Sequence, residues 1–455
     1  MLIGRSEGRP PRASPAGGRF TSGREEFPMD ACYDVVVIGG GPAGSTVGAL
    51  TAAGGRRTLV LERSRFPRFH IGESLMPESY WTFERLGMLG KMKESPFVRK
   101  RSVQFVNASG RESQPFYFEE MNPHESSQTW QVVRSEFDQM MLRNAEERGA
   151  EVWEEANVTD VHLEPSARDE LPRATGVTVT RAGGPPVRVG AKVVVDATGT
   201  NALLSRKLGI RTGEPSLRKA AVFAHYRGGL RDEGRNAGAT LVLATPGQEG
   251  WFWYIPLHDD VVSVGVVADP EYLIRGRGKP EQVLAEEIAT TTGMSRRLAG
   301  ATRVSDVHVL SDFTYRASRV AGDGWVLVGD AFGFLDPIYS SGVFLALKTG
   351  ELAADAINAA FAGGDLSPQQ LASWGDTLAN GYNAIRKLVY AYYTRDFSFG
   401  QFTRSHPECQ KNLVDLLVGD VFRPEVNAIF EPMGKMIPLP DPISIEPPSA
   451  AATRE

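Results

Sequence analysis

Two tryptophans one residue apart, Trp251 and Trp253, are the residues whose type and spacing most directly suggest a reaction pocket. They belong to the stretch Trp-Phe-Trp-Tyr-Ile-Pro at residues 251–256. Because alternate side chains of a strand point to opposite faces, the two indoles share one face, and Phe252 and Tyr254 share the other. A strand with large rings on both faces is either a covered core strand, which is the commoner case, or it lines a cavity.

Lys100 is the second candidate for chemistry, since a lysine donates hydrogen bonds as an ammonium and acts as a nucleophile when neutral. Residues 99–107, Arg-Lys-Arg-Ser-Val-Gln-Phe-Val-Asn, predict one strand. In that strand Val103 and Phe105 share one face, while Lys100 shares the other with Ser102. On spacing alone, Lys100 is a solvated charge at a strand edge.

A glycine-rich turn predicts a dinucleotide site. Residues 34–38, Asp-Val-Val-Val-Ile, suit a buried parallel strand, and residues 39–44, Gly-Gly-Gly-Pro-Ala-Gly, follow at once. Gly39 makes the tight turn, Gly41 lets the backbone approach a pyrophosphate, and Gly44 permits close packing of the next helix on the strand. The N-terminus of that helix would stabilise the phosphate charge.

A second apolar run supports the same site. Residues 58–61, Thr-Leu-Val-Leu, lead into Glu62, which is placed to accept hydrogen bonds from the hydroxyls of an adenosine ribose. Strand, glycines, helix, strand and terminal acid in this order are typical of a Rossmann-like unit. The unit alone does not distinguish FAD from NAD.

Length and composition limit the class of protein. The 455 residues exceed one usual domain, and 42% hydrophobic with 23% charged residues is typical of a soluble globular protein. The net charge of −5 has no polycationic signature, so we expect no nucleic-acid binding. Cys32 and Cys409 are the only cysteines, which fits a reducing cytoplasm. We expect no membrane span, no secretory signal in the first 28 residues and no metal site.

Two later segments resemble those of FAD enzymes with the aromatic hydroxylase fold. Residues 193–199, Val-Val-Val-Asp-Ala-Thr-Gly, resemble the second FAD segment of that fold. Residues 325–331 resemble the third, whose Asp330 approaches the ribityl chain. Arg134 precedes Ser-Glu-Phe-Asp, a capping-box pattern that predicts a helix to about Gly149. In relatives an arginine matching Arg134 meets the FAD; a surface arginine beside a helix start is the alternative.

The Trp-x-Trp-x-Ile-Pro stretch resembles the signature of flavin-dependent halogenases, and two further segments fit that family. Residues 66–74, Phe-Pro-Arg-Phe-His-Ile-Gly-Glu-Ser, resemble the halogenase loop that passes over the flavin and connects its site to the substrate pocket. We assign no role to His70 in this loop. When residues 104–107, Gln-Phe-Val-Asn, are laid on the Lys-Phe-Val-Asn of tryptophan halogenases, Lys100 falls on the essential lysine of the family.

The resemblance implies a reaction centred on Lys100. In such enzymes reduced FAD and oxygen form a C4a-hydroperoxide, and chloride attacks it to give hypochlorous acid. Lys100 would polarise this oxidant as an ammonium, or capture it as a chloramine when neutral. Trp251 and Trp253 would keep the organic substrate away from the peroxide, which favours halogenation over hydroxylation.

The segment at 339–342 departs from the tryptophan halogenases. They carry Glu-Ser-Thr-Gly, whose Glu assists the arenium intermediate, whereas this chain has Tyr-Ser-Ser-Gly with Tyr339 at the Glu position. A phenol or pyrrole stabilises its own cationic intermediate. We therefore expect an electron-rich phenol or pyrrole, presented on an acyl- or peptidyl-carrier protein, rather than free tryptophan. Residues 99–101, Arg-Lys-Arg, together with Arg111 could attract an acidic carrier surface.

A helical pattern follows this segment and runs to about Ala362. Ser340 or Ser341 is the expected N-cap. The helix N-terminus would stabilise the negative charge of a reduced flavin ring. By the resemblance, chloride lies at Ser341 and Gly342, where free backbone N–H groups can hold a small anion.

The expected site thus has a catalytic set and a cofactor set. The catalytic residues are Lys100, Trp251 and Trp253. The residues expected to bind FAD are Gly39, Gly41, Pro42, Ala43, Gly44, Glu62, Arg63, Gly72, Glu73, Ser74, Arg134, Ala197, Gly199, Gly329, Asp330, Pro337 and Gly342.

The resemblance covers about residues 33–390 and implies a mixed α/β fold of the aromatic hydroxylase type. A Rossmann-like FAD-binding domain would carry an inserted mixed β-sheet as the substrate domain. The expected parts are a disordered tail at 1–30, a discontinuous FAD-binding domain at 31–95, 131–214 and 311–390, a substrate-binding sheet at 96–130 and 215–310, a helical cap at 391–440, and a loose tail at 441–455.

Other functions share the three FAD segments. A single-component, NADPH-dependent aromatic monooxygenase or a prenyl-chain reductase of this fold needs neither the tryptophan strand nor the aligned lysine. A catalytically silent flavoprotein that binds a partner would hold FAD without reacting with oxygen after reduction. Since the sequence has no second nucleotide fingerprint, we expect electrons to arrive as free FADH2 from a separate flavin reductase.

Overall fold

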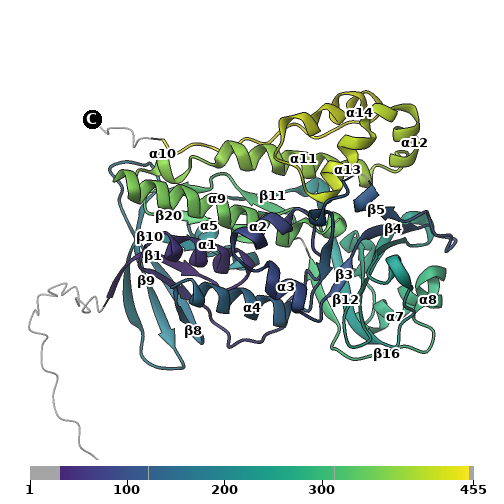
Figure 1. The fold of residues 1–455 in the computed structure, drawn as a ribbon, viewed down its shortest axis with the longest axis horizontal. Coiled ribbons are helices and arrows are strands. Elements are labelled where there is room, and N and C mark those ends of the chain that lie inside the picture. Colours follow the sequence, from purple (N-terminus) through teal and green to yellow (C-terminus); the bar gives the residue numbers. More distant parts are fainter. Residues whose placement is uncertain (1–30, 121, 312, 450–455) are drawn as a thin grey trace, which may run out of the picture.

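The computed structural model describes residues 31–120, 122–311 and 313–449, which form two large β-sheets with helices around them (Figure 1). The first sheet has a parallel centre and an antiparallel hairpin, β8 (Ala156–Glu164) and β9 (Arg173–Arg181), attached to β10. Its main order is β19 (Ala321–Gly322), β20 (Trp325–Leu327), β10 (Val187–Asp196), β1 (Ala31–Ile38), β2 (Thr58–Leu61) and β7 (Glu151–Trp153).

The register of this sheet brings the predicted FAD segments to one edge. Ile38 at the end of β1 is level with Leu61 of β2 and with Asp196 of β10, and Asp196 is level with Leu327 of β20. Because these four strands are parallel, the loops that follow them emerge side by side. Ligands of open α/β sheets bind at this carboxyl edge.

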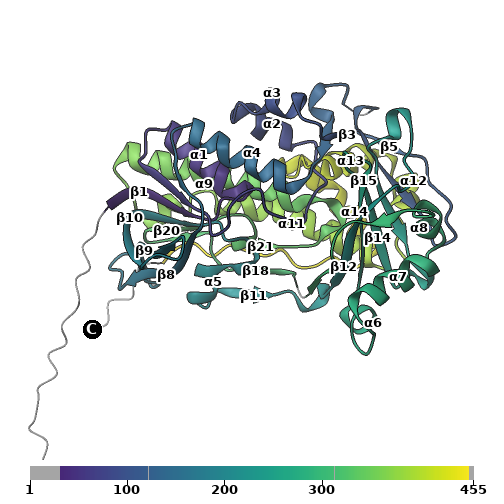
Figure 2. The same cartoon turned by 90° about the horizontal axis from the view of Figure 1, so that it is seen from below.

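Three helices lie together on one face of the sheet: α1 (Pro42–Ala53), α4 (Arg134–Glu147) and α9 (Ser341–Gly363) (Figure 2). The central helix, α1, contacts both of the others. Its contact with α9 is close because Gly350 has no side chain; a Cβ there would lie 3.0 Å from the carbonyl oxygen of Ala43.

The second sheet combines strands from two distant parts of the chain. Its order is β16 (Thr302–Arg303), β12 (Ala220–Arg227), β15 (Val261–Ala268), β14 (Gly250–Pro256), β13 (Thr240–Ala244), β4 (Ser102–Val106) and β5 (Phe116–Tyr117), with β17 (His308–Ser311) also paired to β12. Only β13 and β4 pair in parallel; the other pairs are antiparallel.

The predicted single strand at 99–107 is wrong. The chain forms β3 (Val98–Lys100), which pairs with β6 (Thr129–Gln131), and then, after Arg101, β4 in the second sheet. The buried face of β4 carries the polar Ser102 and Gln104, while Phe105 is 39% exposed. Hydrogen bonds allow this polar face to be buried, and the local sequence pattern does not reveal them. One of them runs from Gln104 Nε2 to the Ser113 carbonyl at 2.8 Å.

The two faces of β14 belong to two different hydrophobic cores, as the alternation predicted. Trp251 and Trp253 are buried in the core shared with the first sheet. Phe252 and Tyr254 pack in a second core with residues of α6 (Pro270–Leu273), α7 (Pro280–Thr290) and α8 (Thr292–Arg297). The tryptophan face therefore looks toward the first sheet.

The remaining elements surround these two layers. A small sheet is formed by β11 (Arg211–Gly213), β18 (Tyr315–Ala317) and β21 (Gly333–Phe334), in that order. The other helices are α2 (Ser79–Arg85), α3 (Leu89–Glu94), α5 (Leu203–Lys207), α10 (Pro368–Leu371), α11 (Gly375–Tyr393), α12 (Phe399–Ser405), α13 (Gln410–Val418) and α14 (Phe430–Met436). The last three lie above the second sheet in Figure 1.

The chain ends differ from expectation where they are described. The tail predicted at 1–30 lies outside the described residues. Residues 441–449 form no helix or strand, yet they are held against the fold rather than loose: Asn383 of α11 bonds Ile443 in both directions, and Glu446 N donates to the Ser318 carbonyl. Among the described residues no helix has the length and apolar character to cross a membrane, and no cluster of potential metal ligands occurs.

Candidate functional site

The glycine turn after β1 has the geometry that its sequence predicts. Gly39 has φ +108°, and a Cβ there would lie 2.3 Å from the Ala197 carbonyl oxygen; a Cβ on Gly44 would lie 1.9 Å from the Gly39 oxygen. At Gly41, the N-cap of α1, no side chain caps the helix, and an added Cβ would approach no atom closer than 3.6 Å. Free N–H groups beside open space fit a pyrophosphate. Pro42 and Ala43 begin the helix.

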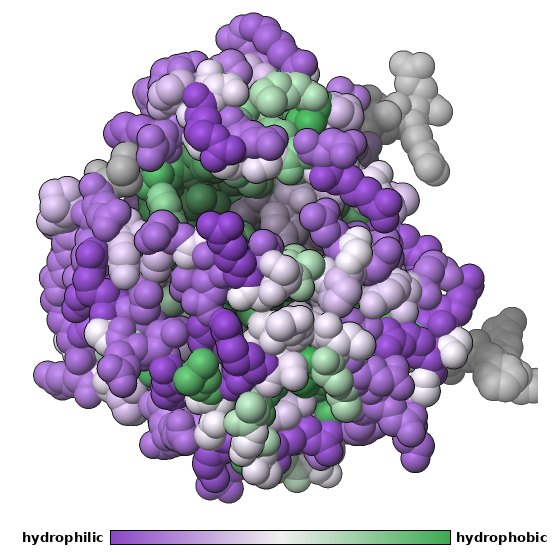
Figure 3. All heavy atoms as spheres, turned by 90° about the vertical axis from the view of Figure 1, so that its right-hand side faces the viewer, coloured by the Kyte–Doolittle hydropathy of each residue, from purple (hydrophilic) through white to green (hydrophobic). Residues whose placement is uncertain are grey.

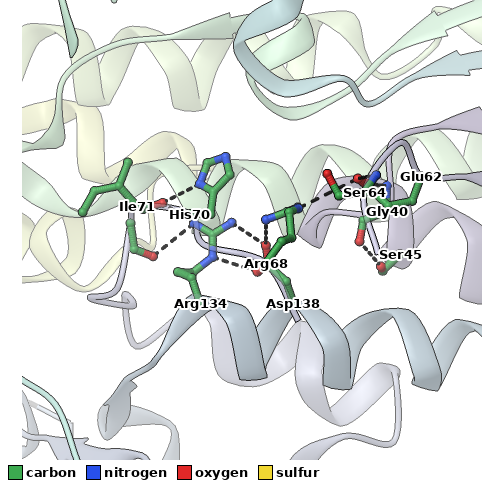
Figure 4. A network of polar contacts seen from close by, with 10 residues as sticks. Gly40, Ser45, Glu62, Ser64, Arg68, His70, Ile71, Arg134 and Asp138 are labelled. Atoms are coloured by element: carbon green, nitrogen blue, oxygen red, sulfur yellow. Dashed lines mark hydrogen bonds and ion pairs between the residues drawn. The ribbon is translucent and has the colours of Figure 1, made fainter. Parts of the chain in front are cut away.

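Glu62 lies beside this turn, as Figure 4 shows. Its carboxylate accepts hydrogen bonds from the backbone N–H groups of Gly40 at 2.8 Å and Ser64 at 2.9 Å. These bonds fix the acid at the carboxyl edge of the sheet, where a ribose would meet it. Arg63 is exposed, and Gly199, with φ +62°, follows β10 at the same edge.

Arg134 is buried and anchors the loop that precedes the site (Figure 4). It forms a bidentate ion pair with Asp138, at 2.7 and 3.0 Å, and donates to the carbonyls of Ile71 and Gly72. Arg68 also pairs with Asp138, at 2.9 Å. Burial alone would raise the pKa of Asp138, but the charges of the two arginines outweigh it and lower that pKa. The predicted capping box is therefore wrong: α4 begins at Arg134, and Asp138 binds arginines instead of capping the helix.

The third FAD segment lies next to the start of α9. Gly329 has φ +56°, and its N–H donates to Thr349 Oγ1 of α9 at 2.8 Å. Burial raises the pKa of Asp330 to about 6, and the charge of Arg134 opposes that rise. Arg134 and Asp330, far apart in sequence, thus lie close enough for the arginine charge to act on the carboxyl; their binding of FAD stays a prediction.

The start of α9 is uncapped. Ser340 is its N-cap residue, with φ +58°, but its side chain makes no capping hydrogen bond, so the expected serine cap does not form. Ser341 is buried, and a Cβ on Gly342 would lie 3.1 Å from the Phe334 ring. Pro337 begins the short 3-10 turn just before. The free N–H groups leave this helix end able to hold an anion.

Lys100 is buried, not solvated. Only 2% of its surface is exposed; its Nζ donates to Ser74 Oγ at 2.8 Å and to the Leu75 carbonyl at 3.0 Å. The Phe118 ring centroid is 5.7 Å from Nζ. No carboxylate in the described ranges pairs with this amine, and burial lowers its pKa to about 7. Lys100 is therefore an amine that loses its proton near neutrality.

A hydrogen-bonded chain fixes the acceptor of Lys100. Gln131 Nε2 donates to Thr240 Oγ1 at 2.8 Å, which leaves the Thr240 hydroxyl free to donate to Ser74 Oγ at 2.9 Å. Ser74 belongs to the predicted flavin loop, and Thr240 is the first residue of β13. The Lys100 amine therefore lies at the junction of the loop at residues 66–74 and the second sheet.

The two tryptophans form a wall on the face of β14 toward the FAD half. Trp251 and Trp253 are 3% and 7% exposed, and their ring centroids are 6.3 Å apart. Trp251 Nε1 donates to the Tyr393 hydroxyl at 2.9 Å, and Trp253 Nε1 donates to Ser263 Oγ at 3.0 Å. Both indoles thus have fixed orientations.

Tyr339 cannot replace the missing carboxylate. Its hydroxyl donates to the Leu388 carbonyl at 3.1 Å, and burial raises its pKa well above the usual value. The phenol therefore stays neutral and already bonded. This arrangement agrees with a substrate that needs no carboxylate to stabilise its intermediate.

Two features of the site were not foreseen. Glu73 is 2% exposed and binds His225 Nε2 at 2.5 Å, and burial, which lowers the His225 pKa, is outweighed by this carboxylate, which raises it. Asp336 accepts a hydrogen bond from Tyr393 at 3.0 Å. No sequence signal marks either pair, because the partners are 152 and 57 residues apart.

The predicted basic cluster is not formed as expected. Lys100 is buried, and the Arg99 guanidinium stacks 4.7 Å over the Trp130 ring. Arg99 and Arg101 are half-buried, and of these four residues only Arg111 is exposed. A hollow with apolar surface lies between the upper and lower parts of the molecule on the face drawn in Figure 3.

Comparison with known proteins identifies the family. The family model described as Tryptophan halogenase matches residues 34–132 and 119–417. The 1H-pyrrole-2-carbonyl-(peptidyl-carrier protein) brominase of Pseudoalteromonas luteoviolacea is 34% identical over 395 residues, 86% of this chain and 92% of the relative. The corresponding chlorinase of Pseudomonas fluorescens is 29% identical over 428 residues, 90% and 94% of the two chains.

A solved structure shows the same fold. The structure of the flavin-dependent brominase Bmp2 superposes with a TM-score of 0.79 at 32% identity, covering 89% of this chain and 99% of that one. The likeness confirms the predicted mixed α/β fold and the predicted resemblance to flavin-dependent halogenases.

Proposed function

Because this chain belongs to the tryptophan halogenase family and is a flavin-dependent halogenase, we propose that it chlorinates an electron-rich phenol or pyrrole carried on a carrier protein, with Lys100 delivering the halogen. The observation that carries this proposal is the buried Lys100 amine between the flavin loop and the substrate sheet. When bound, reduced FAD would supply the electrons with which oxygen converts halide to an electrophilic halogen.

The residues around the two uncapped helix ends would hold the cofactor and the anion. Gly41 at the start of α1 would contact the pyrophosphate, and Glu62 the ribose. Ser341 and Gly342 at the start of α9 would hold chloride beside the flavin ring. Arg134 would act twice: it fixes the loop at Ile71 and Gly72, and its charge favours an anionic cofactor nearby.

Lys100 is suited to act as a neutral amine. A neutral amine has two N–H donors and one lone pair, and the acceptors Ser74 Oγ and Leu75 O use both donors. The lone pair then remains to attack the halogen of a hypohalous acid: the nitrogen–halogen bond would form as the oxygen–halogen bond breaks, and one amine proton would leave with the hydroxide as water. The halogen would then pass to the substrate carbon, whose proton leaves and restores the amine. Trp251 and Trp253 would keep the organic substrate away from the flavin.

The carrier-bound substrate and the separate reductase are part of the same proposal. Both pyrrole relatives act on a carrier-bound acyl group, as their names state. The apolar hollow in Figure 3 would admit the aromatic ring at the end of a thioester arm. Electrons would come from a flavin reductase as free FADH2.

One experiment tests the substrate. The protein is incubated with a flavin reductase, NADH, FAD and either chloride or bromide, and the products of pyrrolyl and tyrosyl thioesters on a carrier protein are analysed by mass spectrometry. The matched free acids and free tryptophan are run beside them. We expect chlorinated thioester at a rate at least about tenfold above the free acids, which corresponds to about 1.4 kcal/mol of added transition-state binding. Efficient halogenation of free tryptophan, or NADPH consumption by the pure protein, would contradict the proposal.

A further inference from the structure

We propose that Tyr393 and Asp336 are positioning residues of the halogenation site. They hold the Trp251 indole at a fixed position relative to the turn that precedes α9, the helix whose start would bind halide. The proposal rests on the roles proposed above for Trp251 and for the start of α9. It concerns two residues that no sequence motif of the site contains.

Three elements that are distant in sequence meet in one chain of hydrogen bonds. Trp251 Nε1 of β14 donates to the hydroxyl of Tyr393, the last residue of α11, at 2.9 Å. That hydroxyl donates to Asp336 Oδ2 at 3.0 Å. An indole N–H only donates and an ionised carboxylate only accepts, so with Asp336 ionised the hydrogen bonds run from Trp251 through Tyr393 to Asp336.

Asp336 connects this chain of hydrogen bonds to the turn that precedes α9. The side chain is 1% exposed, and Oδ1 accepts from the Ile338 N–H at 2.9 Å, which caps the 3-10 turn Pro337–Tyr339. That turn ends at Ser340, directly before α9. Because both carboxylate oxygens have a partner, a loss of the Tyr393 hydroxyl leaves Oδ2 buried without a donor, which costs more than the bond itself.

The charged and titratable groups around Asp336 support the hydrogen bond that it accepts from Tyr393. Tyr339, Tyr392 and Tyr393 face the carboxyl, and the Lys219 ammonium lies 4.2 Å over the Tyr393 ring and pairs with Asp269. Burial raises the pKa of Asp336 to about 7. The Ile338 N–H, the Tyr393 hydroxyl and the Lys219 charge oppose this rise. The tyrosine therefore helps to keep this carboxylate ionised and accepting.

These hydrogen bonds therefore couple the Trp251 indole, which is part of the proposed barrier, to the start of α9, where halide would bind. With its N–H bonded, the Trp251 indole has one orientation; without that bond it can turn about its side-chain torsions. A turned indole opens the wall, and a displaced Asp336 loosens the start of α9. Oxygen would then be reduced to hydrogen peroxide at the expense of reduced FAD, and halide would not be oxidised.

Tyr393→Phe tests the link, with Tyr382→Phe as the matched control. Tyr382 lies three turns earlier in α11 and donates to the Tyr315 carbonyl at 3.3 Å, with no bond to Trp251. Halogenated product, hydrogen peroxide, kcat and the halide KM are measured with saturating reduced FAD. We expect Tyr393→Phe to lower the ratio of product to peroxide about tenfold and to raise the halide KM about tenfold, as the loss of a hydrogen bond to a charged group implies. FAD affinity should equal that of the control.

A double-mutant cycle separates positioning from a general loss of packing. Trp251→Phe removes the indole N–H, and the double variant Trp251→Phe with Tyr393→Phe should be no worse than the more impaired single variant, within about twofold. Multiplied effects would overturn the proposal, as would a Tyr393→Phe enzyme that matches Tyr382→Phe. If the unmodified enzyme produces no halogenated aromatic, the proposed function fails instead.

Discussion

The protonation state of Lys100 gives a quantitative prediction. Burial lowers the pKa of this amine to about 7. The neutral fraction is then about 9% at pH 6, about 50% at pH 7 and about 91% at pH 8, since the ratio of neutral to charged amine changes tenfold per pH unit. If the neutral amine accepts the halogen, the rate of halogen transfer should rise about fivefold from pH 6 to pH 7, approach a tenfold change per unit only below pH 6, and level off above pH 8.

The assay must isolate halogen transfer from the supply of reduced flavin. Chemically reduced FAD is mixed anaerobically with enzyme, and oxygen, halide and substrate are added between pH 5.5 and 9. Halogenated product from a single turnover is quantified by mass spectrometry after rapid quenching. The rate of flavin oxidation, followed by absorbance, serves as the internal reference at each pH.

Two substitutions at Lys100 separate an amine from a cation. Lys100→Met keeps the length of the side chain without nitrogen, and Lys100→Arg keeps a charge that does not titrate in this range. Both should lose a factor of about 10² to 10⁴ in halogen transfer, with FAD content and circular dichroism as checks of folding. A rate that falls as pH rises, or an arginine variant within about tenfold of the unmodified enzyme, would refute the neutral amine.

Four further variants follow from the geometry. Gly41→Ala should fold and weaken FAD binding at least about tenfold, because the new methyl occupies the space of the pyrophosphate. Gly44→Ala should fail to fold, because its Cβ would lie 1.9 Å from a carbonyl oxygen. Equilibrium dialysis measures FAD affinity and circular dichroism measures folding; equal FAD affinity in Gly41→Ala would contradict the cofactor placement. Replacing Trp251 and Trp253 together by Leu should lower halogenation and permit hydroxylated by-product, while unchanged products from a well-folded variant would dismiss the barrier. Tyr339→Phe should cost about 1 kcal/mol of stability in denaturant unfolding yet leave halogenation within about twofold, since its hydroxyl only binds a backbone carbonyl; a large loss of turnover would assign the phenol a chemical role.

The part of the site that sequence predicted best is the part encoded locally. Gly39, Gly41 and Gly44 act through backbone space within one turn, so their spacing is sufficient to predict the geometry. The parallel register of β1, β2 and β10 then brings Glu62 to the same edge. Alternation along β14 likewise separated the tryptophan face correctly, because period two is a property of the strand itself.

Long-range pairs decided the predictions that were wrong. The sequence Ser-Glu-Phe-Asp after Arg134 has a capping-box pattern, but Asp138 binds Arg68, 70 residues away, in addition to Arg134. Two charge-assisted pairs outweigh one cap, since hydrogen bonds between ionised groups are roughly twice as strong as neutral ones. A local pattern contains no information about such a competitor.

The break at Arg101 explains both the failed strand prediction and the site. A continuous strand at 99–107 would place Lys100 in line with β4, at the edge of the second sheet. Because β3 instead pairs with β6, the Lys100 amine reaches Ser74, the last residue of the predicted flavin loop, and Leu75 directly after it. The polar face of β4, which follows the break, is buried. The expectation of a solvated Lys100 depended on a continuous strand at 99–107, and that strand does not form. The break at Arg101, which a periodic pattern cannot represent, therefore brings the Lys100 amine to Ser74 and Leu75, where no carboxylate of the described residues pairs with it and burial lowers its pKa to about 7.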